Sequence, residues 1–95
     1  MIAVMVRDDR IEVSGHAGYD EIGKDIVCAG VSVLVQTLVK SINQLTTDRP
    51  EWEIDRGIFY MSIKNLSEQG KLLVDSFFIG ICGIADAHPD YVRII

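Results

Sequence analysis

The stretch from Ile26 to Leu45 constrains the fold of this chain more than any other part of it. Apolar residues cover most of its helical circumference and leave only a thin polar stripe, formed by Ser32, Gln36, Lys40 and Asn43. Such a helix has to be covered on nearly every side, and one small sheet covers only one side. We therefore expect a second helix against the first, and a second copy of the chain as well.

Apolar residues alternate with other residues in the sequence before this helix and again after it. The alternation over residues 2–13 and 52–64 is interrupted each time by a turn and predicts two β-hairpins. A second helix is predicted over Glu68–Ala87 and a short strand over residues 91–95. The predicted order is ββαββαβ. We expect one α+β domain over residues 1–95, with a small, mostly antiparallel sheet packed with two helices.

The composition is that of a folded domain. Apolar residues make up 48% of the chain and charged residues 24%, which is inconsistent with a disordered tail. The formal net charge of −5 argues against a nucleic-acid backbone as the main partner, so we expect no direct nucleic-acid binding. Polar residues interrupt the long apolar stretch, and we expect no membrane span. The two cysteines form no disulfide framework and no leader segment is recognisable, which together predict a cytoplasmic protein.

One of the two histidines and one of the two cysteines lie close together in the sequence. Asp25 is a good N-cap for the long helix, because its carboxylate can accept from the amides of the first turn. This places Cys28 in that first turn, where the helix dipole and unpaired N–H groups favour a thiolate. His16 follows the first hairpin, at the rim of the sheet. Cys28 is therefore a candidate nucleophile and His16 a candidate base.

The connection between the two residues, 17–24, is longer than a minimal strand-to-helix loop. Gly18 and Gly23 give it conformational freedom, and Tyr19 carries a ring that could contact a ligand. Ser32 lies one helical turn after the cysteine, on the same face, and could border the same site. The alternatives are an ordinary solvated loop and a surface serine on the polar stripe.

The spacing of the histidines and cysteines predicts no metal site, because it lacks the paired close spacings of structural zinc sites. Cys82 lies among apolar residues of the second helix and is expected to be a buried, inert thiol. His88 precedes Pro89 and is expected to cap the end of that helix. On spacing alone, His16 and Cys28 are also compatible with a rim histidine and a half-buried thiol that have no catalytic role.

The residues from 15 to 32 resemble the signature of a known family. The run Gly15-His16-Ala17-Gly18-Tyr19, followed by Gly23-Lys24-Asp25-Ile26-Val27-Cys28-Ala29 and Val31-Ser32, is similar to that of the bacterial ribosomal-processing cysteine proteases known as Prp. The order of strands and helices also resembles that family. Gly30 stands where the family more often has alanine, a departure that lowers helix propensity and leaves the cysteine and histidine in place.

The resemblance implies a homodimeric cysteine endopeptidase without metal or organic cofactor. In that family the substrate is the precursor of the large-subunit ribosomal protein L twenty-seven, whose N-terminal extension is removed. By resemblance, Cys28 is the nucleophile and His16 the general base. Asp25 either orients the histidine or only caps the helix. Gly15 allows close backbone approach beside the histidine, and Ser32 lines the site.

The resemblance also implies that the loop Ala17–Lys24, with Gly18, Tyr19 and Gly23, opens for the peptide and closes over it. Amides of the first helical turn, Val27–Ala29, are the expected donors to the tetrahedral oxyanion. Two other functions remain open. One is a dimeric module that binds a peptide or a ribosomal surface without cutting it, and the other is a thiol sensor in which the cysteine is oxidised reversibly.

Overall fold

The computed structural model describes residues 1–21 and 23–95. Its helices and strands follow the predicted order ββαββαβ, so the α+β class is confirmed. They are β1 (Ile2–Val6), β2 (Arg10–Ser14), α1 (Ile26–Leu45), β3 (Trp52–Asp55), β4 (Ile58–Ser62), α2 (Glu68–Ala87) and β5 (Val92–Ile94).

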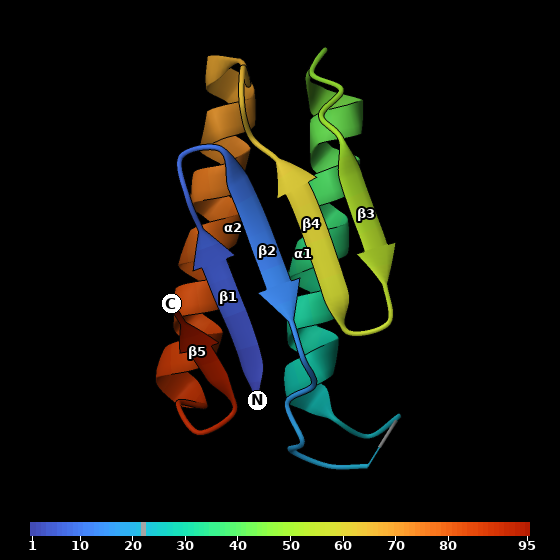
Figure 1. The fold of residues 1–95 in the computed structure, drawn as a ribbon, viewed down its shortest axis with the longest axis vertical. Helices are drawn as coiled ribbons and strands as arrows, with labels where there is room; N and C mark the ends of the chain where they lie inside the picture. The colour runs from blue at the N-terminus through green and yellow to red at the C-terminus, as the bar shows by residue number, and fades with distance from the viewer. Residues whose placement is uncertain (22) are drawn as a thin grey trace.

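The strands form one sheet in the order β3-β4-β2-β1-β5. Neighbouring strands are antiparallel except β5, which pairs in parallel with β1. Both helices lie against the same face of this sheet, with α1 on the side of β3 and α2 on the side of β5 (Figure 1). The loop that follows β2 and the start of α1 meet at one end of the molecule, and this end carries the predicted site (Figure 1).

The core lies between the sheet and the two helices. Alternate residues of the central strands point into it, since Val4 is opposite Val13 and Ile11 is opposite Met61 in the antiparallel registers. A residue spacing of three or four keeps the buried side chains on one face of each helix. These are Val27, Val31, Val35, Leu38 and Ile42 of α1, and Val74, Phe77 and Ile81 of α2.

The two helices approach each other closely. A Cβ added at Gly80 would lie 2.8 Å from Leu34 Cδ2, and one added at Gly30 would lie 3.2 Å from Ile84 Cδ1. Each helix therefore uses a glycine to receive a branched side chain of the other. The predicted close packing of the second helix on the first is confirmed. Gly30, the departure from the family signature, belongs to this contact.

α1 is less covered than its sequence suggests. By length and composition alone it is long and apolar enough to cross a membrane, but its buried stripe packs into the core formed by the sheet and α2. Ile26 and Val33 are each 62% exposed, and Leu45 is 69% exposed. The sheet and α2 thus cover two sides of α1, and the expected second copy of the chain stays a prediction.

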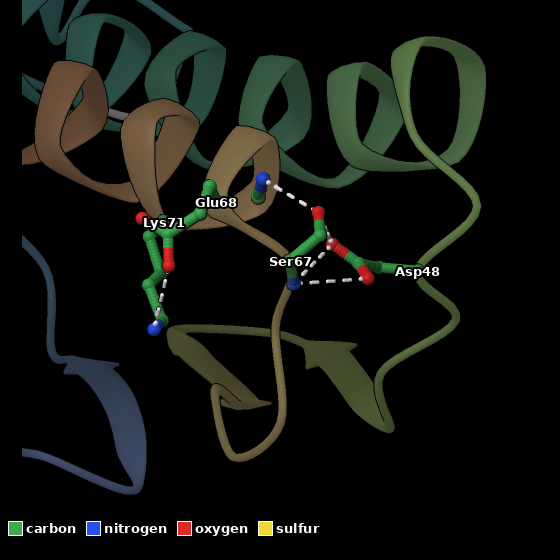
Figure 2. Close-up of polar contacts among 5 residues, drawn as sticks. Asp48, Ser67, Glu68 and Lys71 are labelled. Atoms are coloured by element: carbon green, nitrogen blue, oxygen red, sulfur yellow. Dashed lines mark hydrogen bonds and ion pairs between the residues drawn. The ribbon is translucent and has the colours of Figure 1, made fainter.

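The loop after α1 is tied to the start of α2. The Asp48 carboxylate accepts hydrogen bonds from the Ser67 N–H (3.1 Å) and the Ser67 hydroxyl (2.7 Å), and Ser67 Oγ accepts from the Gly70 N–H at 3.1 Å (Figure 2). Ser67 is the N-cap of α2. This junction lies at the end of the molecule opposite the start of α1 (Figure 1).

Candidate active site at the start of α1

Asp25 fixes the beginning of α1 and the loop before it. One carboxylate oxygen accepts the Cys28 N–H at 2.9 Å, and the other accepts the Tyr19 N–H at 3.0 Å. The Cys28 amide is the main cause that lowers the pKa of the Asp25 carboxyl below its ordinary value of 3.8; partial desolvation opposes this, and the Tyr19 amide adds to it. The predicted N-cap is confirmed, and both oxygens of Asp25 are engaged by backbone amides.

Cys28 lies half-buried in the first turn of α1. Its sulfur accepts a hydrogen bond from the Ala17 N–H, with a donor–acceptor distance of 3.1 Å. Ala17 itself is buried, at 4% exposure, so its amide is held in place. This hydrogen bond ties the loop to the thiol.

His16 is carried to the site by the end of β2. The β2–β4 ladder pairs Ser14 with Ile58, and one more hydrogen bond extends it, from the Gly15 N–H to the Gly57 carbonyl at 2.8 Å. Gly15 has a φ of +96°, and a Cβ added there would lie 2.2 Å from the Met1 carbonyl oxygen. The close backbone approach expected at Gly15 is present, and only glycine permits it.

His16, Cys28 and Ser32 line two hollows on the protein surface. An inner cavity of about 180 Å³ lies between α1 and the sheet. An outer hollow of about 620 Å³ lies beside the loop, and Gly18, Gly23 and Asp25 also line it. The structure thus brings together the predicted nucleophile, the predicted base and the neighbouring serine, with open space on both sides of them.

Tyr19 lies outside this group. Its ring makes edge-to-face contacts with His88 and Tyr91, with ring centroids 5.5 and 5.1 Å apart. Its contacts therefore anchor the loop to the connection between α2 and β5.

His88 caps the end of α2, as predicted. Its backbone N–H makes the capping hydrogen bond, which it donates to the Ile84 carbonyl. Ile22, also part of the predicted loop, lies outside the described residues.

The end of β3 and the turn that follows it contribute residues that the sequence did not single out. Ile54, Asp55 and Gly57 line the inner cavity together with His16. The alternation of residues 52–64 predicted the turn itself. It carried no information on the strand that β4 pairs with, because that pairing joins distant parts of the chain.

A third hollow, of about 590 Å³, lies between α1 and the edge strand β3; we call it the β3 groove. Its lining residues are Gln36, Val39, Lys40, Asn43, Gln44, Trp52 and Ile54. Trp52 and Ile54 pair with the buried Met61 and Phe59, so both point to the helix side of the sheet. They remain 50% and 45% exposed, because β3 is at the sheet edge. Ile54 also lines the inner cavity, so the two hollows share this side chain.

Within residues 1–21 and 23–95, no three His, Cys, Asp or Glu side chains are grouped so that they could hold a metal ion. The chemistry of the described site therefore has to be argued from the thiol, the imidazole and the backbone amides around them.

Comparisons with known proteins agree with the resemblance in the sequence. The family model described as Cysteine protease Prp matches residues 1–93. The ribosomal processing cysteine protease Prp of Staphylococcus aureus is 29% identical over 85 residues, which are 86% of this chain and 80% of the relative. The protein of the same name from Bacillus subtilis is 29% identical over 90 residues, covering 87% and 80%. The crystal structure of the S. aureus protease in complex with a covalently linked product peptide is similar with a TM-score of 0.88 and 27% identity, over 98% of this chain and 94% of that one.

Proposed function

Because the chain belongs to the cysteine protease Prp family, we propose that it removes the N-terminal extension of the large-subunit ribosomal protein L twenty-seven. Cys28 is the nucleophile and His16 the general base in this proposal. One observation carries it: the two side chains line the same inner cavity and the same outer hollow. The proposal includes a cytoplasmic location, where a ribosomal protein would be processed.

The reaction follows from the groups at the site. His16 takes the proton of the Cys28 thiol, and the thiolate attacks the scissile carbonyl carbon to give a tetrahedral oxyanion. When this intermediate collapses, the C–N bond breaks and the imidazolium gives its proton to the leaving amine. Water, deprotonated by the same imidazole, then hydrolyses the thioester and restores the thiol.

We propose a donor to the oxyanion outside the first-turn amides of Val27–Ala29. The Cys28 amide donates to the Asp25 carboxylate and the Ala29 amide to the Asp25 carbonyl, at 2.9 and 3.0 Å, so two of the three first-turn amides are engaged. The Ala17 N–H already points to the sulfur. We assign it to the developing oxyanion, which forms on the carbon bonded to that sulfur.

The peptide substrate occupies the inner cavity and continues into the β3 groove. The S. aureus relative has been crystallised with a substrate peptide as well as with a product peptide. In this chain the groove offers an exposed indole, an exposed isoleucine and an edge strand, which suit an extended apolar peptide. Trp52 and Ile54 are the residues that contact its side chains in this arrangement.

The protein acts as a homodimer in this proposal. Both helices lie on one face of the sheet (Figure 1), and both expose large apolar side chains. Val33 of α1 is 62% exposed, and Leu72 and Ile79 of α2 are 69% and 73% exposed. A second copy would cover them. A stable monomer in sedimentation analysis at micromolar concentration would contradict this part of the proposal.

The test is incubation with the ribosomal protein precursor, followed by mass analysis of the products. Wild type should cut the extension once, and Cys28→Ala and His16→Ala should each abolish cutting while the protein stays folded. Cys82→Ala, which removes the other thiol, should cut normally. Tight binding of the precursor without cleavage would instead favour the binding module. Reversible oxidation of the thiol with no response to peptide would favour the sensor.

A further inference from the structure

The imidazole of His16 lies against the backbone of Gly57 in the β3–β4 turn. A Cβ added at Gly57 would lie 2.9 Å from His16 Nε2, 3.3 Å from Cε1 and 3.5 Å from Cδ2. Three atoms of the His16 ring thus surround the position that a Cβ of residue 57 would occupy. The distance to Nε2 is shorter than real Cβ contacts, so any residue with a Cβ would displace the ring.

The turn that holds Gly57 is fixed relative to the strand that delivers His16. The Gly57 carbonyl accepts the Gly15 N–H at 2.8 Å, and Gly15 immediately precedes the histidine. Within the turn, the Arg56 N–H donates to Asp55 Oδ1 at 2.7 Å. Gly57 has a φ of +65°, a conformation that glycine adopts without strain. The position of the imidazole is therefore coupled to the β2–β4 pairing.

A carboxylate that orients the histidine is the usual third member of such a site. Asp25 is the candidate in sequence, but its two oxygens accept the Cys28 and Tyr19 amides. The His16 ring lies against the backbone of Gly57.

We infer that Gly57 is a positioning residue for the catalytic base. Because Gly57 has no side chain, the His16 imidazole packs against its backbone and is held there beside Cys28. This inference rests on the proposed function, because it takes His16 as the base. Gly57 acts through His16 and does not itself contact the scissile bond. Its replacement should therefore lower kcat and leave KM nearly unchanged.

The test compares Gly57→Ala with Asn65→Ala. Asn65 has a φ of +60° in the connection between β4 and α2, so alanine is strained there as it is at position 57, without contact with the histidine. Gly57→Ala should lower kcat by about 10- to 100-fold, the effect of a displacement of roughly 1 Å in a catalytic group. Asn65→Ala should lose a similar amount of thermal stability and keep the kcat of wild type. A Gly57→Ala protein that is folded and has wild-type kcat would overturn the inference.

A measurement on the wild-type protein keeps the test independent of the variant's folding. Nuclear Overhauser effects should connect the His16 Hε1 or Hδ2 proton with the Gly57 Hα protons. Their absence in the folded protein would also overturn the inference. If His16→Ala cleaves the precursor normally, the proposed function fails. If His16→Ala is inactive but Gly57→Ala is fully active, only the role of Gly57 fails.

Discussion

The Ala17 N–H donates a 3.1 Å hydrogen bond to Cys28 Sγ. The donor is in the loop after β2 and the acceptor is in the first turn of α1, so this contact joins the part of the chain that carries the proposed base to the part that carries the proposed nucleophile. The loop therefore has a role in the resting site, before any substrate is bound.

Removal of this donor should impair the chemical step. Ala17→Pro deletes the N–H, and we expect kcat to fall by about 100-fold, a typical effect of losing one oxyanion donor. Ala17→Gly is the matched control, because it keeps the N–H and removes only a methyl group. Single-turnover cleavage separates the chemical step from binding. Equal kcat values for the two folded variants would exclude a catalytic role of this amide.

The stability contributed by Asp25 should depend on pH in a defined direction. Its pKa is lower in the folded protein than the ordinary value of 3.8, so its stabilisation is fully present above pH 3.8 and is lost as the pH falls through the lower folded value. Asp25→Asn should therefore melt at a lower temperature than wild type at pH 6. The two melting temperatures should converge as the pH drops below 3.8. Thermal melts over pH 2.5–6 measure this, and a constant difference would contradict the assignment.

The junction between Asp48 and Ser67 (Figure 2) should affect stability and leave catalysis unchanged, since it lies at the end of the molecule opposite the site (Figure 1). Ser67→Ala removes the N-cap of α2 and should cost about 1 kcal/mol, which lowers Tm by roughly 4–8 °C in a domain of this size. Lys71→Ala is the control. It breaks only the exposed Lys71–Glu68 ion pair of 3.3 Å, and its effect should stay within about 0.5 kcal/mol.

The β3 groove should contribute to substrate binding. Trp52→Ala removes the exposed indole and should raise KM about tenfold, equivalent to about 1.4 kcal/mol, with little change in kcat. Trp52→Phe keeps an aromatic surface and should have a smaller effect. Steady-state kinetics on a peptide that spans the cleavage site measure both. An unchanged KM in a folded Trp52→Ala protein would show that the peptide does not use this groove.

Tyr19 should act through its ring contacts with His88 and Tyr91. Tyr19→Phe keeps the ring and should behave like wild type. Tyr19→Ala loses both aromatic pairs, and limited proteolysis within the loop should become roughly three- to tenfold faster, in line with the strength of such pairs. If Tyr19→Phe impairs cleavage as much as Tyr19→Ala, the hydroxyl would be the important group, as expected for a direct ligand contact.

The parts of the structure that depend on local signals could be predicted from the sequence. The bounds of α1 and its cap at Asp25 follow from apolar periodicity and a capping side chain. His16 and Cys28 are brought together because His16 directly follows the end of β2, Cys28 lies in the first turn of α1, and a single loop joins these two elements.

The rest of the site depends on contacts between distant residues. The packing of the His16 ring on Gly57 requires the pairing of β2 with β4. The ring contact that holds Tyr19 requires Tyr91, from the other end of the chain. No local pattern encodes either partner. The partner that covers the exposed side of α1 is not encoded locally either: apolar residues show that a surface is to be buried, but they do not say whether the same chain or a second copy buries it.

The hydrogen bond between Gly15 and Gly57 has a consequence for when this protease becomes active. A folding intermediate that has formed α1 and has not yet joined its two hairpins would possess the thiol without an ordered imidazole. Peptide cleavage would then begin only after β2 and β4 have paired.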